Sequence, residues 1–270
     1  MMFDPAAFLK NLNRCAIMGI VNITGDSFSE GPSSAPESAV RRAIALFEAG
    51  ADILDLGAES TRPGSTPVSP EEECRRLLGV LSEIREQLPS AVISVDTRHG
   101  ETAAAALKAG AQIINDVAMG RDEKLLEAVA MHKAALVLCH SRGTPADMSE
   151  AQYTAYDAGL RETVEKELFE AVDKAAARGI PENNIWLDPG IGFAKTAEQC
   201  RTLISEAGCF SQKFPWLWGI SRKSFMGGTP DSRGAETLRL EKELINSRAS
   251  VIRTHDVAAL RSAMNWNKGA

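Results

Sequence analysis

The sequence lacks the features that mark several large classes of protein. Its five cysteines are an odd number at irregular spacing, with no C-x-x-C pair, which argues against a disulfide framework or a zinc site and indicates a reducing compartment. The N-terminal segment 1–5 has an early acid and no apolar core, so it does not resemble a secretory signal. No apolar run approaches the length of a membrane span. These absences predict a cytoplasmic protein without membrane association.

An excess of positive charge is also absent. The chain has 30 basic and 36 acidic side chains and a formal net charge of −6. Such a field repels nucleic acid and anionic lipid, so neither is an expected partner, and a phosphate-bearing ligand must be held by a local basic cluster. The motifs G-x-S-x-G, H-E-x-x-H and the P-loop are missing as well.

What is present is a regular alternation of short apolar runs and amphipathic segments along 270 residues, with no linker that would divide a single domain, 1–270. Eight of the runs have the composition of buried parallel strands: 16–22, 52–57, 92–96, 112–115, 134–139, 184–188, 216–221 and 250–255. Eight successive strand–helix units predict a single (β/α)₈ TIM barrel of the α/β class, and less readily a doubly wound sheet. We expect a loose tail at 265–270.

Several helix ends can be predicted from local signals. Ser69 precedes Pro70 and Glu72, a combination typical of an N-cap, a first helical proline and a capping box, and the helix should reach Leu88. A second helix is predicted from Pro36 to Ala49, and the longest one covers 157–178. The segment 24–38, rich in Gly, Ser and Pro, is interpreted as a mobile lid loop.

Polar side chains end nearly every predicted strand, and in a barrel those ends meet at the catalytic face. Asp96, Asn115 and Asp188 give two carboxylates and an amide in neighbouring positions. They suit the flat edge of a ligand with adjacent donors, such as the 2-amino group and N3–H of a pterin. Metal ligation, or a salt-bridge network with basic residues of the same face, would explain these residue types equally well.

A second group at the strand ends is basic. It comprises Arg62, Lys223, Arg253 and His255, with Asn22 opposite. In an acidic protein such a cluster indicates an anion site, and a helical turn beginning at Ser224 would add free backbone N–H groups. His99 and His132 are predicted to be surface residues of helical segments, and Cys139 to be a core residue.

The strand-end motifs resemble those of the dihydropteroate synthase family, in family order over nearly the whole chain. They are GIVNIT (19–24), DSFS (26–29), GADILDLG (50–57), ESTRPG (59–64), SVDT (94–97), INDV (114–117), DPGIGF (188–193), SRKSF (221–225) and RTHD (253–256). The resemblance implies condensation of 6-hydroxymethyl-7,8-dihydropterin diphosphate with 4-aminobenzoate to dihydropteroate and diphosphate, a step of folate synthesis.

The resemblance also implies roles for individual residues. Asp96, Asn115 and Asp188 would hold the pterin; Lys223 would reach the same ring; Arg253 would lie flat against it and, with His255, bind the diphosphate. Asp96, Lys223, Arg253 and His255 are thus the expected catalytic residues. Asn22 would help to place Mg²⁺ on the diphosphate. The aminobenzoate site would be bordered by Thr61, Arg62, Phe193 and Ser224, and the lid would include Asp26, Ser27, Phe28 and Ser29.

The chain departs from the family pattern at a few positions. Gly25 stands where proline is common, and Ala194 replaces a common glycine. The segment 235–248 is more charged than usual, and because family dimers use helices from this end of the barrel, a homodimer stays an open expectation. Two other functions fit the motifs. A pterin-binding methyltransferase domain would not need the diphosphate cations, and a non-catalytic paralogue would bind pterin without turnover.

Overall fold

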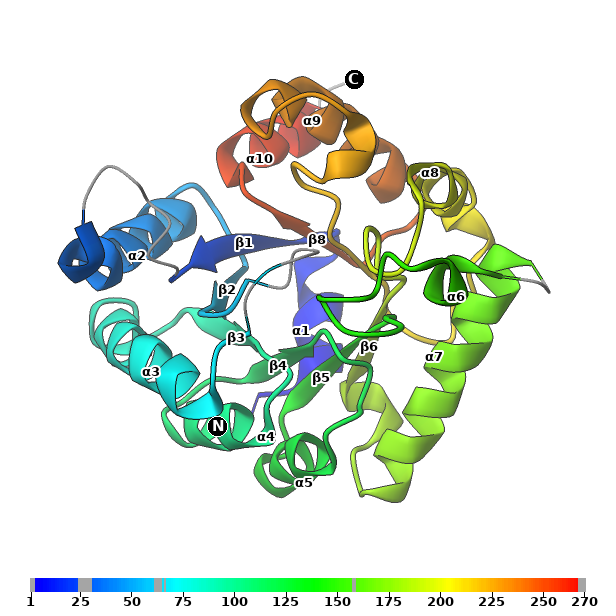
Figure 1. Cartoon of the computed structure of the whole chain (residues 1–270). Helices are drawn as coiled ribbons and strands as arrows, with labels where there is room; N and C mark the ends of the chain where they lie inside the picture. The colour runs from blue at the N-terminus through cyan, green and yellow to red at the C-terminus, as the bar shows by residue number, and fades with distance from the viewer. Residues whose placement is uncertain (1–2, 24–30, 61–64, 66, 157–158, 267–270) are drawn as a thin grey trace.

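A computed structural model of the chain describes residues 3–23, 31–60, 65, 67–156 and 159–266. Its strands are β1 Ala16–Asn22, β2 Ile53–Gly57, β3 Val92–Asp96, β4 Ile113–Asp116, β5 Ala135–Cys139, β6 Ile185–Asp188, β7 Leu217–Trp218 and β8 Val251–Thr254. They pair in parallel in the order β6-β5-β4-β3-β2-β1-β8-β7, and a parallel bridge between Leu187 and Trp216 joins the two edges. The predicted (β/α)₈ barrel is confirmed (Figure 1).

Helices surround the strands (Figure 1). Their bounds are α1 Pro5–Leu12, α2 Gly31–Glu48, α3 Pro70–Gln87, α4 Gly100–Lys108, α5 Glu123–His132, α6 Ala151–Thr154, α7 Leu160–Ala177, α8 Ala197–Ser205, α9 Gly234–Asn246 and α10 Val257–Trp266. A 3₁₀ turn, η3 Ser224–Met226, follows β7. Among the described residues, no helix is long and apolar enough to cross a membrane.

The lid prediction is wrong over part of its length. Helix α2 begins at Gly31, five residues before the predicted start at Pro36, so the stretch 31–38 is helical rather than a loop. Pro32 stands in the first turn, where a missing N–H removes no intrahelical hydrogen bond, whereas Pro36 stands inside the helix and removes one. The remainder of the predicted lid, residues 24–30, lies outside the described residues.

The other element predictions need smaller corrections. Helix α3 has the expected N-cap, in which Ser69 accepts from the N–H of Glu72 at 3.3 Å, but the Glu72 carboxylate pairs with two arginines instead of completing a capping box. Strand β7 keeps only two of six predicted residues. Helix α10 includes Asn265 and Trp266, so the predicted tail begins too early, and its last four residues lie outside the described part of the chain.

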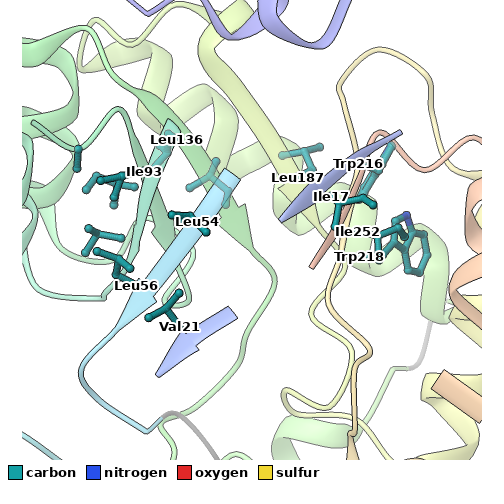
Figure 2. Packing of buried hydrophobic residues seen from close by; sticks show 14 of the residues in the cluster. Ile17, Val21, Leu54, Leu56, Ile93, Leu136, Leu187, Trp216, Trp218 and Ile252 are labelled. Atoms are coloured by element: carbon teal, nitrogen blue, oxygen red, sulfur yellow. The ribbon is translucent and has the colours of Figure 1, made fainter. Parts of the chain in front are cut away.

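Two apolar layers hold the barrel together. The outer layer lies between strands and helices and includes Ile17, Leu54 and Ile93 (Figure 2). The inner layer fills the amino half of the barrel and consists of Ala16, Met18, Ile53, Ile113, Ala135, Val137, Trp186, Leu217 and Val251. Phe8, Leu9 and Leu12 of α1 pack against it, so α1 plugs this end of the barrel; in Figure 1 it lies behind the centre of the ring.

The position of the polar residues follows from the two-residue repeat of a strand. Counting two residues on from an inner-layer residue gives a polar side chain on the same face: Asp55 after Ile53, Asn115 after Ile113, and Asp188 after Trp186. The interior is therefore apolar at the amino end and polar at the carboxyl end. This gradient places the candidate site.

An ion cluster ties the amino end of the barrel together. Asp52 accepts from both terminal nitrogens of Arg14 at 2.7 Å, from the N–H of Ile17 at 2.8 Å and from Arg261 at 3.1 Å. Burial opposes the charge of Asp52, but the bonds from Arg14 and Ile17 outweigh it and lower its pKa below the ordinary value. The ionised carboxylate thus stabilises the fold.

We expect Asp52→Asn to lower the free energy of unfolding at pH 7 by about 2–3 kcal/mol, because it weakens charge-assisted hydrogen bonds. The folded pKa lies below the unfolded one, so this stabilisation is present above pH ~4 and is lost as the pH falls through the folded pKa. Denaturant titrations at several pH values should show the difference from wild type shrinking in acid. Glu101→Gln, in an exposed pair with Lys124, is the control and should leave stability unchanged. A difference that does not shrink as the pH falls below about 4 would contradict the account.

Candidate active site

Four strands bring charged and polar side chains together around one guanidinium. Arg253 of β8 donates through Nε to Asp55 of β2 at 2.6 Å and through Nη2 to Asp96 of β3 at 2.7 Å. Asn115 of β4 donates its Nδ2 to the same oxygen of Asp55 at 3.2 Å. Asp55 is completely buried, and Asn115 and Arg253 are largely so. The set forms one connected network inside the carboxyl end of the barrel.

Two acceptors of this network have no partner within the described residues. They are Oδ1 of Asp55 and Oδ1 of Asn115, both buried. The orientation of Asn115 follows from chemistry, because its amide nitrogen must face the acceptor-only carboxylate. Buried polar atoms are nearly always hydrogen-bonded, and leaving one unpaired costs about 1–3 kcal/mol. These oxygens therefore mark a place where the donors of a ligand would be accepted.

In this network, burial disfavours the charged forms of Asp96 and Arg253, and the attraction between the two groups favours them. Burial raises the pKa of Asp96 to about 7, against the lowering effect of Arg253 and with a smaller raising effect of the Asp55 charge. Burial also opposes the charge of Arg253, but Asp55 and Asp96 raise its pKa, so the guanidinium stays protonated. If Arg253 moved away from Asp96, the carboxyl group would lose its charge partner. It could then bind a proton or accept a hydrogen bond from a ligand.

Asp188 and Lys223 form the neighbouring part of the site. Asp188 Oδ1 accepts from the N–H of Gly190 at 2.7 Å, and the Lys223 ammonium donates to the carbonyl of Ile191 and lies 4.7 Å from the centre of the Phe193 ring. Burial raises the pKa of Asp188 and lowers that of Lys223, while the charge of each group opposes the shift of the other. The two charges are therefore mutually dependent.

The glycine motif after β6 has a geometric cause. Gly190 has φ +70°, and a Cβ at this position would lie 1.9 Å from the carbonyl oxygen of His140. Gly192 has φ +83°, and a Cβ there would lie 3.2 Å from Cδ of Lys223. Only glycine allows the backbone to pass this close to the end of β5 and to Lys223.

The predicted anion group is assembled in part. The ring of His255 places Nδ1 2.9 Å from Oγ of buried Ser221, which also accepts from the His255 backbone N–H at 3.2 Å. Ser221 thus orients the histidine. Ser224 begins the η3 turn, as predicted, and is exposed. Asn22 is exposed at the end of β1, beside Gly57 in the strand register.

The predicted residues that the structure brings together at the carboxyl end of the barrel are Asp96, Asn115, Asp188, Phe193, Lys223 and Arg253. Other predicted residues lie outside the described part of the chain: Thr61, Arg62, Asp26, Ser27, Phe28 and Ser29. Asp55 was missed, although a single acid within an otherwise apolar strand, Ile53–Gly57, is a recognisable signal.

The histidine predictions divide. His132 is exposed, as predicted. His99 is not a surface residue: it is half-buried at the start of α4, with Nε2 3.6 Å from Glu59 at the end of β2. Helical periodicity could not predict this pairing, because the two residues are far apart in the sequence and come together only when β2 and β3 pair in the barrel. Cys139 is buried, as predicted.

A recess lies beside this site, between the loops that follow β3, β4 and β5. It shares Phe193 with the site and is lined also by Arg98, Arg121 and Arg142. Arg98 and Arg142 already pair with carboxylates, Glu59 and Glu167. The recess is therefore a neighbour of the charged network and not its centre.

Comparison with known proteins assigns the family. A family model described as pterin binding enzyme matches residues 18–255. Dihydropteroate synthase of Synechocystis is 40% identical, covering 92% of this chain and 87% of that protein. Folic acid synthesis protein fol1 of Schizosaccharomyces pombe is 37% identical over 92% of this chain, which spans only 35% of that longer protein. A solved dihydropteroate synthase of Xanthomonas albilineans with 4-aminobenzoic acid superposes with a TM-score of 0.88 at 36% identity, covering 95% of this chain and 93% of that one.

The match thus includes every strand end described above, and it extends over most of the stand-alone synthases. The chain belongs to the pterin-binding enzyme family.

Proposed function

We propose that the carboxyl end of the barrel is the active site of a dihydropteroate synthase, a transferase that joins 6-hydroxymethyl-7,8-dihydropterin diphosphate to 4-aminobenzoate. The observation that carries the proposal is the pair of unpartnered buried acceptors on Asp55 and Asn115, set among Asp96, Asp188 and Arg253. A pterin has a planar edge of adjacent donors that such acceptors would bind.

Asp96, Asn115 and Asp188 would hold the pterin ring. Asp188 spends one oxygen on Gly190, and its second oxygen lies toward Gly219, where a Cβ would be 3.7 Å from both Asp188 and Arg253. The absence of a side chain at Gly219 keeps this space open to a flat ring. The planar guanidinium of Arg253 would then leave Asp96 and lie against the ring, since arginine stacks on planar π systems.

Cations would stabilise the leaving group. Cleavage of the C–O bond of the pterin methylene leaves negative charge on diphosphate, and preformed donors and cations lower the energy of that charge as it develops. Arg253, Lys223 and the His255 ring held by Ser221 are the groups available for this role. A pterin-binding methyltransferase would have no use for such a set.

We propose that Mg²⁺ accompanies the diphosphate. Within the described residues, no three His, Cys, Asp or Glu side chains are grouped to hold a metal, and Mg²⁺ often takes most of its oxygens from phosphates and water. The exposed amide oxygen of Asn22 fits as a single protein ligand. When bound, the ion would neutralise charge on the leaving group.

The second substrate would lie on the outer side of the pterin, bordered by Phe193, Lys223 and Ser224 and by Thr61 and Arg62. The X. albilineans relative was solved with 4-aminobenzoic acid. An aromatic amine is weakly basic and therefore unprotonated at neutral pH, so its lone pair can attack the methylene without a general base. The acidic anilinium that forms would then lose its proton to water or to the departing diphosphate. The proposed partners are thus small molecules.

We also propose a cytoplasmic location. A reducing cytoplasm suits the buried free thiols of Cys15, Cys139 and Cys200.

We expect Asp188→Ala to weaken pterin binding roughly 100-fold, because it removes charge-assisted hydrogen bonds worth about 1.5–3 kcal/mol each. Isothermal titration with the pterin diphosphate measures the effect. Asp116→Asn is the matched control: Asp116 is an equally buried carboxylate at the end of β4, bound to the N–H groups of Ala118 and Gly120. It should lower stability and leave pterin affinity unchanged. Full affinity in folded Asp188→Ala would refute the pterin assignment.

A separate prediction concerns the leaving group. His255→Ala should weaken binding of diphosphate about tenfold or more and slow turnover, because one charge-assisted contact is lost. Mg²⁺ should strengthen diphosphate binding to the wild type. His132→Ala, at the exposed end of α5, should change neither quantity. If diphosphate affinity and turnover survive in His255→Ala, the anion site lies elsewhere.

A further inference from the structure

We propose that Lys195 is a positioning residue for the second substrate, acting through a partly buried chain of hydrogen bonds that fixes the loop carrying Phe193. The proposal rests on the proposed function, because it assumes that Phe193 and Lys223 border the aminobenzoate. Lys195 follows the DPGIGF motif and has no place in the mechanism described above. It is one of three groups that meet where helix α7 and the loop after β6 pass the end of β5.

The chain runs from α7 through the end of β5 to this loop. Glu167 Oε2 lies 3.0 Å from Nε2 of His140, and Nδ1 of His140 lies 2.9 Å from Nζ of Lys195. Lys195 also donates to the carbonyl of Phe193 at 3.0 Å. His140 has no exposed surface at all. The three side chains form a continuous path to the Phe193 backbone.

The chemistry of the end groups fixes the direction of every bond. An ammonium can only donate and a carboxylate can only accept, so the imidazole between them accepts at Nδ1 and donates at Nε2. Burial and the Lys195 charge lower the pKa of His140 to about 3, so the ring is neutral. His140 is therefore held as a single tautomer.

The same cluster holds the next carbonyl of the loop. Glu167 also binds Arg142, whose guanidinium carbon lies 4.2 Å from the centre of the Tyr156 ring. The Tyr156 hydroxyl donates to the carbonyl of Ala194 at 3.0 Å. We call the five side chains Glu167, His140, Lys195, Arg142 and Tyr156 the loop clamp.

The loop needs such support because its backbone is strained. Ala194 has φ +47°, the left-handed region that costs an L-residue a measurable penalty. Ala194 is flanked by the two held carbonyls, its own and that of Phe193. External hydrogen bonds thus hold the conformation that the sequence alone would not favour.

The clamp ends at the substrate-facing side of the site. The loop supplies both contacts that hold the Lys223 ammonium, the Ile191 carbonyl and the Phe193 ring. Asp188, by contrast, is held by the N–H of Gly190, ahead of the clamped carbonyls. Loosening the clamp should therefore displace Phe193 and Lys223 more than the pterin-binding carboxylate.

The test compares Lys195→Met with Lys174→Met. Lys174 is the matched control, since its Nζ donates to the carbonyl of Gly120 at 2.7 Å in another strand-end loop. Lys195→Met should raise KM for 4-aminobenzoate about tenfold and KM for the pterin diphosphate by a clearly smaller factor, because Lys223 also serves the diphosphate. Lys174→Met should change neither. Lys195→Gln, whose amide can still donate to Phe193, should recover part of the loss.

Equal rises in both KM values, or an effect of Lys195→Met no larger than that of Lys174→Met, would overturn the proposal. Nitrogen NMR of the His140 ring gives a readout that does not need activity: wild type should carry the proton on Nε2 alone, and Lys195→Met should become a mixture of tautomers. A wild-type ring protonated on Nδ1 overturns the clamp. A wild-type enzyme with no turnover would instead contradict the proposed function, and the histidine tautomer would still decide the clamp.

Discussion

The ion pairs of Arg253 are the interaction on which the carboxyl end of the barrel depends. Asp55 and Asp96 come from adjacent strands and are both shielded from water, so their charges repel each other in a medium that screens them poorly. Arg253 bridges them and offsets the cost of burying both. Removing one partner of such a set leaves an uncompensated buried charge, which is more damaging than replacing the whole set by apolar groups.

The bridge also bears on the proposed function. A ligand that supplied its own donors to Asp96 would compete with Arg253, and the freed guanidinium would remain next to the ligand because β8 fixes its backbone. Binding would then exchange one set of charge-assisted bonds for another and would leave no isolated charge. Lys223 and Asp188 compensate each other in the same way. Burial shifts the pKa of each group in the direction that favours its neutral form, and the charge of its partner opposes that shift.

Much of this arrangement could be predicted from the sequence, and the failures have a common cause. Strands such as Val92–Asp96 are found from their composition because a buried parallel strand is apolar on both faces. The start of α2 was misplaced because Pro36 and its small polar neighbours favour loops locally, whereas the barrel favours a helix there. Asp55 was missed because its partner Arg253 is 198 residues away. Patterns along the chain show what each residue is, but only closure of the barrel shows what it meets. The roles of the individual site residues remain predictions.

The Asp52 cluster and the catalytic face lie at opposite ends of the same strands. Asp52 precedes Ile53, while Gly57 closes β2 beside Asp96, roughly 15 Å further along at the rise of an extended chain. Residues separated by this distance and sharing no partner contribute to free energy almost independently. Stability and chemistry are thus divided between two poles of one barrel. Substitutions that stabilise the amino end, which α1 plugs, can therefore accumulate without altering the site at the carboxyl end. The added stability would allow the protein to tolerate destabilising changes in substrate recognition.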